Sequence, residues 1–430
     1  MTVRKFSHFL FFYVKLSFYL CGGKNQPERT SVFIMKALQS KNQFIATILA
    51  FAVIPMSGLA TDIYLPSMPS MATELHQPES SIQLTLSIFL ISYGLTQFFA
   101  GSVVDSFGRF RVSAVSLALF VVSFLITALT KDIYVIYAMR VLQGILSGFA
   151  VVSKRAFFVD VYEGEKRKHY LSIMTIVWSV GPIIAPFIGG YLQKLFGWQS
   201  NFYVLAGYSL ILLILELFFS GETLKVKKPF HFDYVLKEYD LMFRTKDFFY
   251  GMLMCGVSYA MVIFFNLCGA FIIEHKMGYS EVVAGYVSLI LGFAWMTGGF
   301  LGKALIKKAF LPKIRYANFI QIFLIAAMIL CSFYLNTIFT LVAFAFVIHV
   351  TAGFIFNNYF AYCIGRFPDS AGIAGGLTGG VAFIITSAIS YGIVALIKPE
   401  NQLEVAEGYF VLGILGLIIL SITKLRKAHV

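Results

Sequence analysis

Charged side chains are scarce in this sequence. Asp, Glu, Lys and Arg make up 13% of its 430 residues, while apolar residues make up 59%; charged residues in soluble domains usually reach about 25%. The mean hydropathy is +0.80, and no soluble globule has enough interior to bury so much apolar surface. The composition therefore excludes soluble, disordered and fibrous proteins and predicts a membrane protein with many spans.

Cysteine is also rare, and the five cysteines contain no C-x-x-C pair. This arrangement favours small packing residues over a disulfide or a metal site. The sequence has no Walker loop, no His/Cys set with metal-ligand spacing and no nucleophile–base pattern. We therefore expect no enzyme activity, no metal and no cofactor.

The net charge of +13 could in principle attract nucleic acid. The basic residues, however, lie in short gaps between apolar runs, where membrane orientation explains them better. We expect no nucleic-acid partner.

Apolar runs long enough to cross a bilayer, about 20 residues each, occur twelve times. The predicted spans are 43–68, 80–103, 112–130, 133–157, 170–192, 199–220, 247–273, 280–302, 315–335, 338–364, 370–397 and 404–423. The longest polar stretch between spans divides them into six plus six, and transporters are commonly built from such repeated halves. We predict an all-α polytopic membrane protein with two six-helix bundles, 35–220 and 247–430, joined by a central loop, 221–246.

Lys and Arg are divided unequally between the two sets of loops. From Lys36 onward, the loops on the N-terminal side contain most of them, whereas the opposite loops contain only Lys131, Lys194, Lys276 and Lys398. Basic residues are enriched in cytoplasmic loops. We therefore expect both termini and the central loop to be cytoplasmic.

Residues 1–34 precede this pattern. Their apolar run, 9–21, loosely imitates a signal peptide, but no A-x-A-like cleavage site follows it. A conventional basic start begins at Met35. We interpret 1–34 as an extension from an upstream start or as an amphipathic anchor.

The loop between the second and third predicted spans combines glycines with charges and reads GSVVDSFGRFR over residues 101–111. Gly101 allows a close helix approach and Gly108 a tight turn. Asp105 can face the positive end of a helix, and Arg109 can pair with a carboxylate, for which Asp160 is the expected partner. The loop resembles the G-x-x-x-D-x-x-G-R-[KR] motif of the major facilitator superfamily.

Further segments narrow the resemblance. RVLQG at 140–144 is similar to a motif of proton-coupled members, and GPIIAPFIGG at 181–190 is similar to a motif of the antiporter branch. Together with TDIYLPSMP, ETL and PDSAG at 61–69, 222–224 and 368–372, they resemble the Bcr/CflA group of bacterial drug-resistance exporters. The resemblance covers about residues 35–426. It implies the major facilitator fold, the inner membrane of a bacterium and the proton as coupling ion.

Asp62 is the only acid well inside the first span, and an ionisable residue at such depth costs several kcal/mol unless it faces water or a partner. At 1.5 Å per residue, Asp62 lies ~15 Å and Arg140 ~11 Å from the outer helix ends. We predict that both face one cavity, where Asp62 carries a proton and Arg140 tunes its affinity. Alternatively, Asp62 caps a half-helix before Pro66 or pairs structurally, and Arg140 clamps backbone carbonyls.

The proline–glycine stretch of span five points to a gate. Pro182 and Pro186 remove backbone donors, while Gly181, Gly189 and Gly190 thin one helix face. We expect a kinkable helix that packs tightly and seals one side of a rocking transporter. Ordinary small-residue packing is the alternative and largely coincides with this interpretation.

Substrate contacts are expected from aromatic and amide side chains near mid-span. The candidates are Tyr64, Tyr93, Gln143, Trp178, Tyr259, Asn266, Asn357 and Asn358. Aromatic walls with few charges suit amphipathic or lipophilic-cationic molecules, and the alternative for each residue is helix packing or lipid contact. We interpret His349 as a helix-contact histidine and Glu216 as a residue that extends to the interface.

These observations together predict proton-coupled efflux of small amphipathic molecules, drugs or toxic metabolites, by alternating access. The expected partners are the small-molecule substrate, protons and membrane lipid, and the functional unit is expected to be a monomer. An exporter of an endogenous metabolite such as a siderophore would share every motif. An importer is the remaining alternative, against which the antiporter-type stretch argues.

Overall fold

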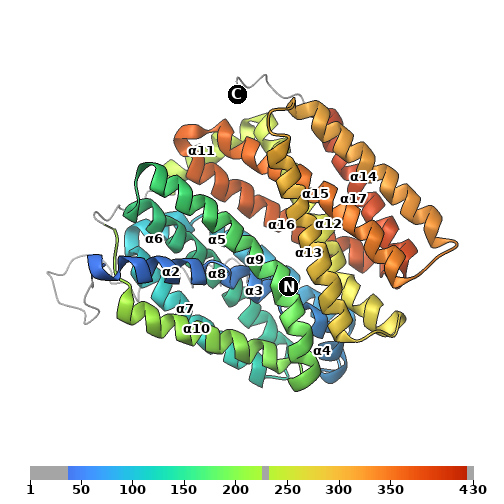
Figure 1. Cartoon of the computed structure of the whole chain (residues 1–430), viewed down its shortest axis with the longest axis horizontal. Helices are drawn as coiled ribbons and strands as arrows, with labels where there is room; N and C mark the ends of the chain where they lie inside the picture. Colours follow the sequence, from blue (N-terminus) through green and yellow to red (C-terminus); the bar gives the residue numbers. More distant parts are fainter. Residues whose placement is uncertain (1–36, 225–231, 424–430) are drawn as a thin grey trace. The chain divides into compact units, whose positions relative to one another are not determined.

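The computed structural model describes residues 37–224 and 232–423, so the predicted extension 1–34 lies outside the described residues. Within these ranges the chain is helical apart from one bridge between Ala37 and Glu222. The elements of the first part (Figure 1) are η1 (Ser40–Asn42), α2 (Gln43–Val53), α3 (Met56–Asp62), η2 (Leu65–Ser67), α4 (Met68–Glu74), α5 (Glu79–Gln97), α6 (Ala100–Phe107), α7 (Arg109–Leu129), α8 (Ile133–Val161), α9 (Gly164–Phe196) and α10 (Gln199–Phe219). Those of the second part are α11 (Phe232–Arg244), α12 (Lys246–Phe271), η3 (Ile272–Lys276), α13 (Glu281–Ala304), α14 (Phe310–Ser332), α15 (Ile338–Arg366), η4 (Pro368–Ser370), α16 (Ala371–Ile397) and α17 (Gln402–Ile422).

The predicted all-helical membrane fold is confirmed. Eleven helical segments of the described residues are long and apolar enough to cross a membrane, and α5 with α6 forms a twelfth if this bent pair is one span. Large apolar side chains such as Phe323, Phe339 and Leu396 are exposed on the helix surfaces. Such surfaces require lipid rather than water around them.

The first span is broken into pieces rather than continuous. It extends from Ser40 to Glu74, further than the predicted 43–68, and is interrupted between α2 and α3 and again around η2. Pro55 and Pro66 lie at these two breaks, where proline removes a backbone donor. Discontinuous spans in transporters expose free backbone groups near a binding site, and α3 ends at Asp62.

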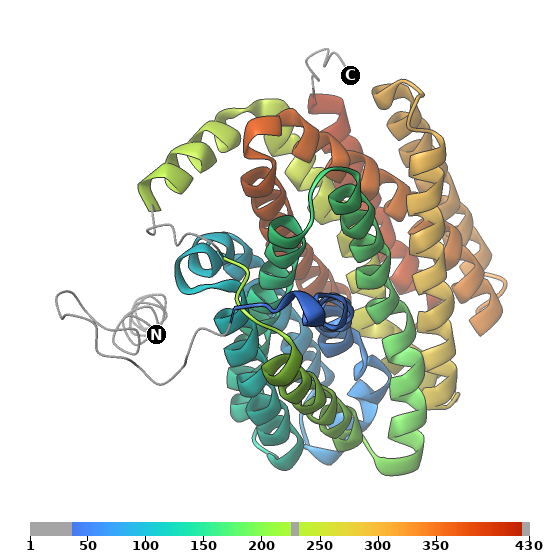
Figure 2. The ribbon, with the colours of Figure 1, turned by 60° about the vertical axis from the view of Figure 1, so that its left-hand side comes forward.

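The predicted central loop contains a helix, α11, that the sequence analysis did not anticipate. The Tyr239 hydroxyl donates to the carbonyl oxygen of Phe98 at 2.7 Å, where α5 and α6 meet at a bend of 59°. Burial raises the pKa of Tyr239 to about 12, so the hydroxyl keeps the proton that it donates. Ser370 donates to Glu238 at 2.9 Å, and Figure 2 shows α11 reaching the start of α16.

Two pairs of helices join the N-terminal half (α2–α10) to the C-terminal half (α12–α17). α5 packs against α16, and α9 packs against α13. Glycines bring the backbones close in both pairs: a Cβ atom on Gly94 would lie 2.7 Å from the Gly380 carbonyl oxygen, and one on Gly285 would lie 2.8 Å from that of Pro186. Side chains therefore do not interlock at these points.

Candidate functional site

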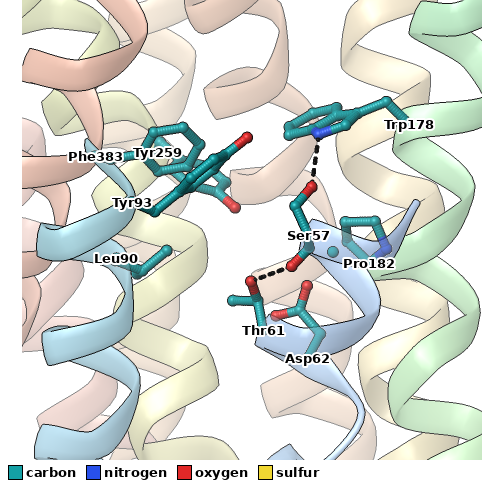
Figure 3. A pocket seen from close by; sticks show the side chains of 10 residues that line it. Ser57, Thr61, Asp62, Leu90, Tyr93, Trp178, Pro182, Tyr259 and Phe383 are labelled. Carbon is teal, nitrogen blue, oxygen red and sulfur yellow. Dashed lines mark hydrogen bonds between the residues drawn. The ribbon is translucent and has the colours of Figure 1, made fainter. Parts of the chain in front are cut away.

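Two neighbouring cavities lie between the halves and share Asp62, Trp178, Pro182 and Tyr259. The first (Figure 3) is also lined by Ser57, Gly58, Thr61, Leu90, Tyr93 and Phe383. The second is also lined by Ser179, Ile183, Pro186, Val262, Asn266, Ser288, Leu291, Gly292 and Trp295. The walls come from α3, α5 and α9 of one half and from α12, α13 and α16 of the other. A molecule held here would contact both halves.

Asp62 is the only carboxyl group among these lining residues, and the residue is 3% exposed. Its carboxyl has no hydrogen bond or ion pair within the described part of the chain, and its Oδ1 atom is fully enclosed. Asp62 also ends α3, where the helix dipole is negative and offers a carboxylate no support. Neither structural alternative, a cap or an ion pair, is present here. The surroundings suit the neutral acid, because an unpaired charge at such a place is costly.

Arg140 lies outside both cavities, so the predicted shared cavity is not found. Its Nη1 donates to the carbonyl oxygen of Ala60 at 2.9 Å and to Oε1 of Gln143 at 3.1 Å. The guanidinium carbon lies 3.9 Å from the centre of the Tyr64 ring, a cation–π contact that compensates for complete burial. Arg140 thus holds a carbonyl of the helix that carries Asp62, which matches the backbone-clamp alternative.

A small network fixes the wall next to Asp62. Trp178 donates from Nε1 to the Ser57 hydroxyl at 3.2 Å, and Thr61 donates to the Ser57 carbonyl at 2.6 Å. Figure 3 shows both bonds on the side of the first cavity that carries Asp62. The indole position is therefore set by α3.

The proline–glycine stretch of α9 lies between α3 and the C-terminal half. A Cβ atom on Gly181 would lie 2.8 Å from the Pro55 carbonyl oxygen, and one on Gly189 would overlap that of Ile63. On the other side, a Cβ atom on Gly190 would lie 2.7 Å from the Glu281 carbonyl oxygen of α13. These glycines thus connect the Asp62 segment to the opposite half, as a seal would require.

Replacing Gly189 by leucine is expected to impair transport strongly. The new side chain must push α9 away from Ile63, next to Asp62, and overpacking typically costs about 1–3 kcal/mol, or roughly tenfold in an equilibrium. Transport by equal amounts of folded protein in vesicles measures the effect. Gly207→Leu on α10 is the matched control, because nothing lies within 4 Å of its Cβ position. Normal transport by the Gly189 variant would contradict the gate interpretation.

Around the Gly108 turn the predicted pairing is present: Arg109 Nε lies 2.8 Å from Asp160 Oδ2, and Arg109 also contacts Asp105 at 2.7 Å. Gly108 has a φ of +100°, which favours glycine. Gly101 differs from the prediction, since no atom lies within 4 Å of its Cβ position and it brings no helix closer.

Glu222 completes this network, a role that the sequence analysis did not assign. Its Oε1 accepts hydrogen bonds at 3.0 Å from the backbone N–H groups of Arg109, Thr223 and Leu224. The Thr223 hydroxyl donates to Asp160 at 3.1 Å. The ETL segment thereby joins the end of the sixth span to the third and fourth spans.

Four of the eight substrate-cavity candidates line a cavity. Tyr93 lies on the first, Asn266 on the second, and Trp178 and Tyr259 on both. The other four lie outside both cavities: Tyr64 bonds Thr85, Gln143 bonds Arg140 and Thr127, and Asn357 and Asn358 donate to carbonyls of their own helix. Tyr64 and Gln143 bond neighbouring helices, as the packing alternative predicts, whereas Asn357 and Asn358 bond within α15.

Several lining residues were missed: Ser57, Thr61, Ser288, Trp295 and Phe383. Ser57 and Thr61 lie one turn apart on the segment that carries Asp62, and this spacing is the signal that could have found them. The other three belong to apolar helices whose cavity-facing side no local pattern reveals. Within 37–224 and 232–423, no group of three His, Cys, Asp or Glu residues could hold a metal.

Glu216 was interpreted wrongly. Instead of extending to the interface, Glu216 is fully buried and forms an ion pair with Lys154 of α8, which is also buried.

His349 contacts another helix, as predicted. Its Nε2 lies 3.0 Å from the Tyr409 hydroxyl of α17.

Known proteins resemble this chain in sequence and in fold. The family model "Major Facilitator Superfamily" matches residues 50–391. A bicyclomycin resistance protein homolog of Haemophilus influenzae is 26% identical over 362 residues, 83% of this chain and 90% of the relative. Multidrug resistance protein D of Escherichia coli K12 is 25% identical over 381 residues, 86% and 92% of the two chains.

The crystal structure of a D-xylose-proton symporter shares the fold, with a TM-score of 0.67 at 16% identity over 88% of this chain and 96% of that one. The matched family and relatives are membrane transporters. The chain is accordingly a multi-pass membrane transporter and not an enzyme.

Proposed function

We propose, from the premise that this chain belongs to the Major Facilitator Superfamily, that it exports small amphipathic molecules in exchange for protons. The observation that carries the proposal is the unpaired Asp62 carboxyl on a broken span, in cavities walled by both halves. A carboxyl without a partner can be neutral or charged depending on what occupies the cavity. The names of the relatives support drug-like substrates.

The substrate and the proton then compete for the Asp62 carboxylate. A molecule that enters the cavities brings polar or cationic groups to Asp62 and favours loss of its proton, while protonation of Asp62 favours release of the molecule. The glycine-lined contacts between α5 and α16 and between α9 and α13 permit the halves to rock. Alternating access follows from such a movement around a fixed site.

The lysine and arginine distribution supports an orientation with both termini on the cytoplasmic side of a bacterial inner membrane. In that orientation the Gly108 turn, α11 and the Glu222 network face the cytoplasm. The proton gradient across such a membrane can then drive export.

Reconstitution into liposomes tests the proposal. A proton gradient is imposed across the membrane, a pH-sensitive dye reports it, and tetraphenylphosphonium, a neutral amphipath and an anionic amphipath are added in turn. We expect at least one compound to dissipate the gradient, and the same compound to accumulate less in cells that contain the protein. Movement of compound without any proton movement would refute antiport, and increased cellular accumulation would indicate an importer.

A further inference from the structure

We infer that Tyr259 is a positioning residue for the proton step: its hydroxyl, carried by the C-terminal half, donates a hydrogen bond to the deprotonated carboxylate of Asp62 in the N-terminal half. This inference rests on the proposed function, because it requires Asp62 to lose its proton during transport. Both residues line both cavities. Figure 3 shows Tyr259 and Asp62 on opposite walls of the first cavity.

A charged Asp62 needs a donor that its own half does not supply. The hydroxyl of Thr61 and the indole N–H of Trp178 are both used by Ser57. Ser57 itself donates towards the Ile54 carbonyl at 3.5 Å. A buried acceptor left without a partner costs about 1–3 kcal/mol, and more when it is charged.

Arg140 does not fill this need either. Its Nη1 is directed to Ala60 and Gln143. Its Nε and Nη2 have no partner among the described residues, but the residue lines neither cavity. The other titratable group on the span-one segment beside Asp62, Tyr64, bonds Thr85 at 3.0 Å. From α9, the shared lining residues Trp178 and Pro182 carry no titratable group.

The remaining side chains with donors on the cavity walls are Tyr93, Tyr259, Asn266, Ser288 and Trp295, since Ser179 donates to the Ile176 carbonyl oxygen. Ser288 and Trp295 line only the second cavity. Asn266 lines only the second cavity and lies about 10 Å, two helical turns, from Tyr259 along α12. Tyr93 lines only the first cavity, whereas Tyr259 lines both. Tyr259 is thus the donor that accompanies Asp62 along both cavities.

The ring of Tyr259 is held firmly within its own half. Its centre lies 5.3 Å from that of Trp295, 5.8 Å from that of Phe383 and 5.9 Å from that of Phe356. Its hydroxyl has no hydrogen bond to any residue of 37–224 or 232–423 that the structure records. The hydroxyl therefore moves together with the C-terminal half, as is required of a group that links proton binding to the movement of the halves.

The consequence is a link between the halves that depends on the protonation state. When Asp62 gives its proton to water, the carboxylate accepts a hydrogen bond from the Tyr259 hydroxyl, and this bond links the two halves across the cavity. When Asp62 is protonated again, the neutral acid no longer needs this donor. A substrate in the cavity competes for the same carboxylate. The hydrogen bond from Tyr259 to the Asp62 carboxylate thereby depends on three events: proton loss, substrate loading and the approach of the two halves.

Infrared titration of purified protein tests the inference without a substrate. The carboxyl band that disappears in Asp62→Asn is followed between about pH 4 and pH 10. Tyr259→Phe removes only the hydroxyl and keeps the ring contacts, and we expect the midpoint of the Asp62 band to rise by about 1 pH unit, since a hydrogen bond to a charged group contributes about 1.5–3 kcal/mol. Tyr93→Phe is the matched control, with a shift well below this.

A fluorinated tyrosine introduced at position 259 is a better donor of the same shape, and it should move the midpoint in the opposite direction. It also replaces the phenylalanine variant should that variant fail to fold. An unchanged midpoint in both variants, or an equal shift in Tyr93→Phe, overturns the inference and leaves the proposed function intact. If the wild-type protein shows no Asp62 titration at all, the inference and the proposed proton coupling both fail.

Discussion

Replacing Asp62 by asparagine is expected to abolish uphill, proton-driven transport while substrate still binds. Asparagine has the same shape but carries no exchangeable charge, and Asp62 is the only carboxyl on the two cavity walls. In the wild-type protein, substrate affinity should rise with pH by up to about tenfold per unit while binding displaces a proton. In the variant this pH dependence should disappear.

The measurement compares substrate binding at several pH values with counterflow and gradient-driven uptake in the same liposomes. Counterflow, which needs no proton, should survive in Asp62→Asn. Glu165→Gln is the control, because this carboxylate is exposed and forms an ion pair with the exposed Lys168. Full gradient-driven transport by Asp62→Asn would remove this carboxyl from the mechanism.

Replacing Glu216 by leucine is expected to lower the free energy of unfolding by about 3–5 kcal/mol, the usual cost of leaving one partner of a buried ion pair unpaired. Lys154 would then hold a charge inside the N-terminal half, where both side chains are almost completely enclosed. The double variant Lys154→Met with Glu216→Leu should recover most of the loss, since apolar residues of similar size often replace a buried pair without cost.

Unfolding of the purified variants in detergent, followed by thermal or denaturant titration, measures these differences. The exposed Lys168–Glu165 pair serves as the comparison, and its removal should change little. Equal stability of the single Glu216 variant and the wild-type protein would show that the pair exchanges with water in solution. A double variant less stable than either single variant would show that the ion pair stabilises the fold more than an apolar pair of similar size.

Features set by neighbouring residues could be predicted from the sequence, whereas those whose partners come from distant segments could not. The Arg109–Asp160 ion pair was predicted because the Gly108 turn defines where Arg109 lies, and one acid ends the fourth span nearby. Glu216 was misinterpreted because nothing beside it in the chain announces Lys154. The α11 helix was missed because its register depends on Tyr239 reaching the carbonyl freed at Phe98.

The sequence alone predicts a polytopic helical transporter with twelve spans, of which the described residues form eleven or twelve, and it identifies Asp62 as the only acid well inside the first span. These are properties of apolar run length and of motif spacing, which neighbouring residues set. The folded structure alone shows that Asp62 and Tyr259 line the same two cavities, while Arg140 and Tyr64 line neither. The reason is that a span apolar on every side carries no polar stripe to show which face points inward, so packing against other helices sets its rotation.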